Sequence, residues 1–148
     1  MNLSYAVTLC LTTFICFIGR AEGETRRPEN ITWEELPELP NSPGLSGAFA
    51  GVSNGALIVA GGSNFPQTPE RKAGIRFWYA DIYVLSETEQ DTWLTGFKLE
   101  KPQAYGASVS NGEHLILIGG NNAEGYHKEV TQITWDATTR KIKQETMP

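Results

Sequence analysis

The sequence predicts an all-β protein built from repeated four-stranded units. The first observation is a repeat, because VSNGALIVAGG at residues 52–62 returns as VSNGEHLILIGG at residues 109–120. Self-similarity at such a separation is typical of proteins that stack copies of one supersecondary unit. The second observation is that no sustained 3.6-residue apolar spacing follows residue 23, so we expect almost no helix.

Each unit contains four candidate strands. In the first unit they are an alternating stretch at 47–52, an apolar run at 56–60, a third strand at 80–85 and a fourth at about 93–99. An Asn-Gly dipeptide follows the first strand in both copies and supplies the two positive-φ residues that a tight hairpin turn requires. The first two strands of each unit should therefore be antiparallel neighbours.

Pairs of glycines end the second strand of both units, Gly61 with Gly62 and Gly119 with Gly120. Glycine weakens a strand, so its presence indicates a place where a side chain would collide with neighbouring backbone. A Gly-Gly pair after an apolar strand, followed by a third strand and a Trp, resembles the kelch repeat, whose four-stranded units form the blades of a β-propeller. The alternative is a β-sandwich in which the two stretches are alike by chance.

The kelch resemblance implies blade one at about 47–99, blade two at about 104–146 and a lone strand at 31–36. Propellers need about four to eight blades to close, and two blades alone leave sheet faces and edges bare. Either several copies associate into a homo-oligomer, or these 148 residues are the amino-terminal piece of a longer protein. We favour the second alternative.

Residues 1–23 are predicted to be a secretory signal peptide. An uncharged run from Met1 to Gly19 is followed by small residues that suit cleavage after Ala21 or Gly23. A membrane anchor is the alternative, and two features oppose a simple signal: no Lys or Arg precedes the run, and several Arg follow it. We expect a periplasmic or secreted protein that meets the membrane only transiently, through this segment.

Composition narrows the partners. The formal net charge of −5, without clusters of Lys and Arg, argues against a nucleic-acid partner. Both cysteines, Cys10 and Cys16, lie in the predicted signal segment, so the remaining chain has no thiol for a zinc site or a nucleophile. We expect no metal and no cofactor.

A more specific resemblance lies in the strings PGLSGAFAGVSNGALIVAGGSNFP, WYADIYVL, QAYGASVS and LILIGG. They resemble the sialic acid mutarotase (N-acetylneuraminate epimerase) family, and more closely its cyclically permuted branch, over about residues 31–135. The resemblance implies a six-bladed propeller outside the cytoplasm that interconverts the anomers of N-acetylneuraminate. Such ring opening needs one group to take a proton from the anomeric hydroxyl and another to protonate the ring oxygen.

The loop between the second and third strands of the first unit, GSNFPQTPERKAGIRFWY, contains the first set of candidate substrate-binding residues. Long loops in compact domains are often functional, and a guanidinium group is the natural partner of a sugar carboxylate. Cationic side chains would meet the anionic sugar, and aromatic rings would stack on its apolar face. The candidates are Asn64, Phe65, Arg71, Lys72, Arg76, Trp78 and Tyr79. The alternative is that the charges are solvated and the aromatic rings cap the blade.

The matching loop of the second unit, NNAEGYHKE, adds Asn121 and Asn122 for hydroxyl recognition. Glu124 and His127 are weak candidates for proton exchange, because a loop His is more often a plain surface residue. Tyr105, at the start of a first strand, is the last substrate-binding candidate, because it should stand close to the propeller axis with its hydroxyl toward the central funnel. Packing is the alternative role for Tyr105. The resemblance implies that the Glu and Arg that the mutarotase family is thought to use lie in a blade without a counterpart here. The alternative that this chain alone is inert therefore stays open.

The function that the resemblance implies is therefore a sialic acid epimerase, with the sugar as a small-molecule partner. The rival hypothesis, from another class, is a non-catalytic kelch propeller that binds a glycan or a protein through the same loops.

Overall fold

The fold comes from a computed structural model that describes residues 32–40, 44–66, 74–88 and 91–148. The chain divides into two units, Met1–Trp33 and Glu34–Pro148, and the elements below all belong to the second. The predicted signal segment, 1–23, lies outside the described residues. Within the described ranges, no helix is long and apolar enough to cross a membrane.

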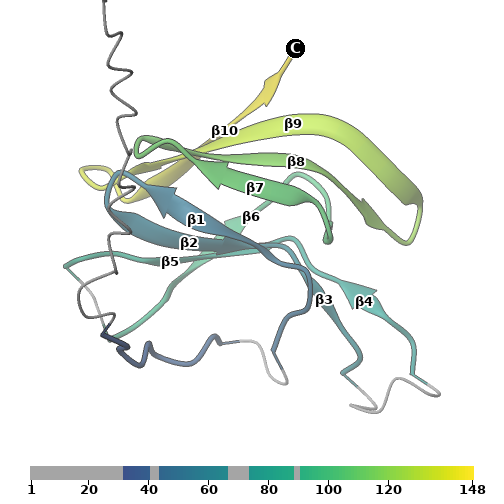
Figure 1. The fold of residues 1–148 in the computed structure, drawn as a ribbon, viewed down its shortest axis with the longest axis horizontal. Coiled ribbons are helices and arrows are strands. Elements are labelled where there is room, and N and C mark those ends of the chain that lie inside the picture. Colours follow the sequence, from purple (N-terminus) through teal and green to yellow (C-terminus); the bar gives the residue numbers. More distant parts are fainter. Residues whose placement is uncertain (1–31, 41–43, 67–73, 89–90) are drawn as a thin grey trace, which may run out of the picture. The chain divides into compact units, whose positions relative to one another are not determined.

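The first sheet has four antiparallel strands in the order β1-β2-β5-β6 (Figure 1). They are β1 (Phe49–Ser53), β2 (Ala56–Ala60), β5 (Asp81–Leu85) and β6 (Leu94–Lys98). Each lies within two residues of a strand expected from the sequence. The described parts of the chain contain no helix, so the all-β prediction is confirmed.

The second sheet repeats this order with longer strands. They are β7 (Ala107–Ser110), β8 (His114–Asn122), β9 (Gly125–Asp136) and β10 (Lys141–Met147), in the order β7-β8-β9-β10. The segment NNAEGYHKE, expected to be a loop, is instead the end of the β8–β9 hairpin, with Asn122 paired to Gly125. The segment has no Pro to interrupt the pairing, and Gly125 takes the φ of +139° that closes the turn.

The two Asn-Gly turns differ. In the first, Asn54 and Gly55 have φ of +46° and +78°, as a tight hairpin turn requires. In the second, the central residues move to Gly112 and Glu113, and only Gly112 has positive φ, at +94°. The Asn111 side chain accepts hydrogen bonds from the backbone N–H groups of Glu113 and His114. The one-residue insertion in the second copy therefore changes the turn while the strands stay antiparallel.

A small hairpin that the sequence pattern did not predict lies between β2 and β5. Its strands are β3 (Ser63–Asn64) and β4 (Phe77–Trp78), which pair antiparallel and project from one end of the first sheet (Figure 1). Two-residue strands carry too little alternation to be recognised in a sequence. The hairpin fixes both ends of the long loop that had been predicted to bind substrate.

The lone strand expected at 31–36 is not formed, because residues 32–39 have irregular backbone. The following residues cover the outer face of the first sheet. Leu39 and Leu45 pack against buried Tyr83, Leu85 and Trp93. The Trp93 indole N–H also donates to the Pro37 carbonyl at 2.8 Å.

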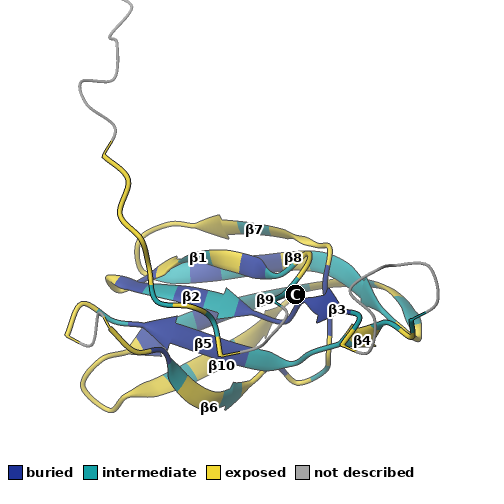
Figure 2. Cartoon of the chain, turned by 90° about the horizontal axis from the view of Figure 1, so that it is seen from below, coloured by how far each residue is buried: buried dark blue, intermediate teal, exposed yellow. Residues whose placement is uncertain are grey.

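The main core lies between the two sheets, where the face of β1, β2 and β5 meets the face of β8 and β9. Figure 2 shows buried residues gathered on β2 and β5 and exposed ones on β6 and β7. Fully buried Ser53 links the sheets, since its hydroxyl donates to the Glu113 carbonyl and accepts from the Trp135 N–H. The sheets are thus joined by polar bonds as well as by apolar contact.

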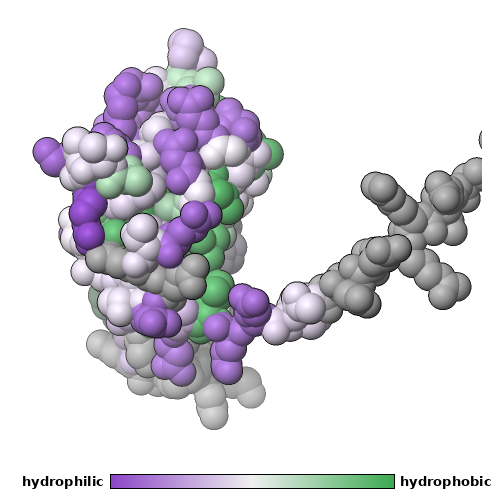
Figure 3. Space-filling model, turned by 90° about the vertical axis from the view of Figure 1, so that its left-hand side faces the viewer, coloured by the Kyte–Doolittle hydropathy of each residue, from purple (hydrophilic) through white to green (hydrophobic). Residues whose placement is uncertain are grey.

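The backbone N–H and C=O groups on the free edge of β1 form hydrogen bonds with side chains of β7 and not with its backbone. The hydroxyl of Ser110 accepts from the Val52 N–H at 2.7 Å, and that of Ser108 donates to the Ala50 carbonyl at 2.9 Å. An exposed strand edge invites pairing with other chains, so these bonds also protect it. Viewed from the end that holds the β1–β2 and β9–β10 turns, the surface is mainly hydrophilic, with hydrophobic residues along one side (Figure 3).

Candidate functional site

The loops after the second strand of each sheet lie at the same end of the molecule. The β3–β4 hairpin and the tip of the β8–β9 hairpin both extend to the right in Figure 1. They are in direct contact, because the Trp78 indole N–H donates to Asn121 Oδ1 at 3.2 Å. The two segments that contain most of the candidate binding residues therefore lie side by side in the fold.

A hollow of about 390 Å³ lies between the two hairpins. Its lining consists of Phe65, Gly74, Arg76, Trp78, Asn121, Asn122, Gly125 and Tyr126. Five of these residues had been chosen as substrate-binding candidates from the sequence alone: Phe65, Arg76, Trp78, Asn121 and Asn122. Tyr126 was missed, although it is 92% exposed at the rim, because a single aromatic residue in a polar stretch gives no periodic signal.

Arg76 is the centre of an aromatic cluster beside this hollow. Its guanidinium carbon lies 4.9 Å from the ring centroid of Phe65, 5.2 Å from that of Tyr105 and 5.8 Å from that of Trp78. Cations within about 6 Å of a ring centroid are attracted by the ring quadrupole. In the described part of the chain, no carboxylate forms an ion pair with Arg76. The guanidinium is therefore held by rings and not by a counter-ion among these residues.

Tyr105 is tightly fixed in this cluster. Its φ of +61° is unusual for a bulky residue, and its backbone N–H donates to the Gly47 carbonyl at 2.8 Å. A Cβ on Gly47 would lie 2.5 Å from the Tyr105 ring, so the ring packs directly on glycine backbone. The Ser63 hydroxyl donates to the Tyr105 hydroxyl at 3.1 Å. These contacts explain how Tyr105 keeps its ring against Arg76.

Asn64 and Tyr79 were also predicted to bind substrate, but their polar groups bond within the protein. Asn64 is 7% exposed and donates from its amide to the Gly44 carbonyl at 2.8 Å. The Tyr79 hydroxyl donates to Asn64 Oδ1 at 2.7 Å. This pair ties the β3–β4 hairpin to the segment before β1, which is a structural role, and contact with substrate stays a prediction.

Glu124 and His127, the weak catalytic candidates, do not line the hollow. Glu124 is exposed at the β8–β9 turn, where its backbone N–H donates to Asn122 Oδ1 at 2.8 Å. His127 neighbours rim residue Tyr126 on β9, so its side chain points to the opposite face of the strand. Its Nε2 atom is buried and has no partner among the described residues. The predicted proton exchange between them stays a prediction, as do Arg71 and Lys72, which lie outside the described residues.

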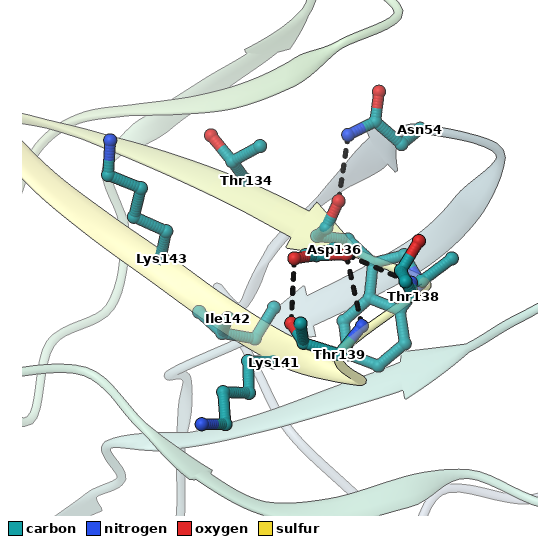
Figure 4. Close-up of a pocket in the computed structure, with 10 residues that line it drawn as sticks. Asn54, Thr134, Asp136, Thr138, Thr139, Lys141, Ile142 and Lys143 are labelled. Carbon is teal, nitrogen blue, oxygen red and sulfur yellow. Dashed lines mark hydrogen bonds between the residues drawn. The ribbon is translucent and has the colours of Figure 1, made fainter.

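A second hollow, of about 690 Å³, lies at the opposite end of the molecule, beside the β9–β10 turn. Figure 4 shows Asn54 reaching β9, where its amide donates to the Trp135 carbonyl at 2.7 Å. Asp136 accepts from the Thr139 hydroxyl at 2.7 Å and from the backbone N–H groups of Thr138 and Thr139. The Asn54 amide and the Asp136 carboxylate of this hollow are thus bonded within the protein.

The bonds at this turn make stability depend on pH. The hydroxyl and the N–H of Thr139 hold the pKa of Asp136 below its ordinary value. A carboxyl group with a depressed folded-state pKa stabilises the fold above its unfolded pKa of about 4, and this contribution is lost as the pH falls through the folded value. We expect Asp136→Asn to have a lower melting temperature than the wild type at pH 7. The difference should shrink toward pH 2 in thermal melts, and an undiminished difference would contradict this role for Asp136.

In the described ranges, no group of three His, Cys, Asp or Glu side chains lies close enough together to hold a metal ion. The hollow between the two hairpins has the lining of a binding site, with one cation, several aromatic rings and two side-chain amides.

Two successive four-stranded sheets, which meet near their first strands and carry their loops at one end, have the architecture of two neighbouring blades of a kelch-type β-propeller. The solved structure of YjhT matches 78% of this chain with a TM-score of 0.68 and 26% identity, over 35% of its own length. The family model described as N-acetylneuraminate epimerase matches residues 20–142. The chain belongs to the N-acetylneuraminate epimerase family.

Curated relatives agree with this assignment. The N-acetylneuraminate epimerase of Salmonella enteritidis PT4 is 36% identical over 72% of this chain, and that of Yersinia enterocolitica serotype O:8 is 34% identical over 77%. The chain spans 30% and 32% of the length of these two relatives. The resemblance to the sialic acid mutarotase family, deduced from the sequence, is therefore confirmed.

Proposed function

We propose that this chain forms the sugar-binding part of an N-acetylneuraminate epimerase, which interconverts the anomers of the sugar by acid/base ring opening. The observation that carries the proposal is the hollow between the β3–β4 and β8–β9 hairpins, where Arg76 is held by rings in a member of this family. A pyranose with a carboxylate presents an apolar face for rings, hydroxyls for amides and a charge for a guanidinium.

The described residues supply binding groups more clearly than an acid and a base. Ring opening needs a proton acceptor and a proton donor within hydrogen-bond reach of the sugar. Neither Glu124 nor His127 lines the hollow. We infer that the proton-transferring groups come from other blades of a six-bladed ring.

Two features support a longer propeller. Gly61 lies against the Gln103 carbonyl, in the segment that leads to the next sheet, whereas Gly119, in the same position of the second sheet, meets only the His127 carbonyl among the described atoms. Ile58 of the first sheet is buried at the interface with the second sheet. The equivalent face of the second sheet is less covered, since Ile116 on it is half-buried and Ile118 is 44% exposed. We infer that a third sheet packs on this face and that its connection crosses Gly119.

The alternative source of a third sheet is a second copy of this chain. Sedimentation of the 148-residue chain separates the two possibilities, because a monomer favours a longer single chain and a defined oligomer favours a ring of copies.

The test of the activity is the rate at which freshly dissolved N-acetylneuraminate reaches anomeric equilibrium, followed by proton NMR or polarimetry. We expect acceleration by the chain extended with the sequence encoded after Pro148, and little by residues 1–148 alone. An extended, folded propeller that leaves the rate at that of buffer would refute the epimerase proposal. It would leave the non-catalytic glycan-binding or protein-binding propeller as the function.

We also propose that residues 1–23 direct export and that the protein works in the periplasm or outside the cell. The uncharged run before Arg20 supports this proposal. Sequencing the amino terminus of the exported protein tests it, and a mature protein that still begins at Met1 would contradict it.

A further inference from the structure

We propose that Arg76 makes this site selective for acidic sugars by binding the sugar carboxylate, and that Trp78 and Tyr105 are the residues that position its guanidinium. The proposal rests on the proposed function, since it assumes that a sugar occupies the hollow between the two hairpins.

The ring contacts attract the guanidinium of Arg76 without forming hydrogen bonds to a carboxylate or carbonyl oxygen. Rings within 4.9–5.8 Å of the guanidinium carbon attract the cation by its charge. The N–H donors of arginine lie in the guanidinium plane and point along it, where they match the two oxygens of a carboxylate. A guanidinium held by aromatic rings is therefore prepared for a bidentate anion at the cost of little side-chain entropy.

Arg76 also differs from the lysines whose ion pairs are described, because no described carboxylate pairs with it. Lys98 pairs with Asp81 at 3.1 Å, Lys101 with Glu129 at 3.3 Å and Lys143 with Glu145 at 2.6 Å. Arg76 is half-buried, lines the hollow and has no such partner among the described carboxylates. A half-buried cation without a counter-ion attracts an anionic ligand more strongly than a neutral one.

The rings that surround Arg76 are themselves held in place. The Trp78 indole is tied to Asn121 across the hollow, and the Tyr105 hydroxyl is tied to Ser63. Both bonds join the β3–β4 hairpin to the second half of the chain, at Asn121 on β8 and at Tyr105 before β7, so the position of the guanidinium depends on how these parts pack together. The geometry therefore predicts that loss of the Tyr105 ring weakens selectivity for the acid, although Tyr105 need not touch the sugar.

The experiment compares N-acetylneuraminic acid with its methyl ester, which is the same sugar without the negative charge. Binding to the 148-residue chain is followed by NMR through the indole N–H signal of Trp78. We expect the wild type to bind the acid about tenfold to a hundredfold more tightly than the ester, because hydrogen bonds to a charged group are stronger than those to a neutral one. Arg76→Gln should bring the ratio close to one, and Arg76→Lys should give an intermediate ratio.

Equal binding of acid and ester by the wild type, no binding of the acid, or an unchanged ratio in a folded Arg76→Gln would each overturn the proposal. If Arg76→Gln does not fold, salt decides the matter in the wild type. Binding of the acid should weaken as NaCl is raised and that of the ester should not, because salt screens the charge. Parallel salt dependence of the two ligands would also overturn the proposal.

Two variants at position 105 test the positioning role. Tyr105→Phe keeps the ring and should keep the ratio of acid to ester binding, whereas Tyr105→Leu should lower it. A general loss of structure would weaken both ligands together and leave the ratio unchanged, which would contradict the positioning role. The outcome is independent of catalysis, because a protein that prefers the acid without accelerating anomer exchange supports Arg76 while refuting the epimerase.

Discussion

Trp135→Ala is expected to lower the free energy of unfolding by about 3–5 kcal/mol, the range for removing a large aromatic side chain from a core. Trp135 is 2% exposed and lies in the core between the two sheets. Its ring meets the ring of Phe97 edge to face, with centroids 5.8 Å apart. Small domains are stable by about 5–15 kcal/mol, so this one substitution should remove much of the stability.

The measurement is equilibrium unfolding in urea, followed by far-ultraviolet circular dichroism. Tyr126→Ala is the matched control, because it also removes a large aromatic ring but from a side chain that is 92% exposed. We expect the control to change stability by less than about 0.5 kcal/mol. Similar losses in the two variants would show that the sheets do not pack through Trp135.

The sequence allowed the strands to be placed because their pattern is redundant. The runs ALIVA in β2 and DIYVL in β5 are mostly apolar. The β2 run also has a counterpart in β8 of the second unit, and the repeat supports its assignment as a strand. Turn chemistry was less transferable. The same three letters, SNG, place Asn54 and Gly55 at the centre of one turn but Gly112 and Glu113 at the centre of the other. A single added residue decides this, and its effect depends on pairing across the whole hairpin.

The candidate site was partly predictable for a different reason. A long loop rich in cations and aromatic rings drew attention to Arg76 and Trp78, and the structure brings both to the hollow. The sequence made Tyr105 a binding candidate through its expected place near the axis, but it did not indicate that the Tyr105 ring would lie against Arg76. Nor could it separate buried Asn64 from Asn121, since hydrogen bonds to Gly44 and Tyr79 arise only from the tertiary fold.

The interface between the sheets explains why glycine recurs at the end of β2. Gly61 has a φ of +64°, and its N–H donates to the Asp81 carbonyl at 2.9 Å. The next residue, Gly62, donates to the Gln103 carbonyl at 2.9 Å. The segment that enters the second sheet thus crosses directly over the glycine pair. Gly61 is the point where the backbone of one sheet touches the connection to the other.

Gly61→Ala should therefore destabilise the protein by about 2–4 kcal/mol, from two causes. A non-glycine residue in the left-handed region costs about 1–2 kcal/mol. In addition, a Cβ at this position would overlap the carbonyl oxygen of Gln103, which is backbone and has little freedom to move. Relief of the overlap would shift the connection and weaken the bond from Gly62, at a cost of about 1 kcal/mol or more.

Gly96→Ala separates the two causes. Gly96 has a φ of +93°, but a Cβ there would meet nothing within 4 Å. This control should lose only the conformational part, about 1–2 kcal/mol. The excess loss in Gly61→Ala over Gly96→Ala, measured by urea unfolding, then reports the contact between β2 and the connection at Gln103. Equal losses in the two variants would mean that the connection moves aside freely, and that the glycine pair does not set the distance between the two sheets.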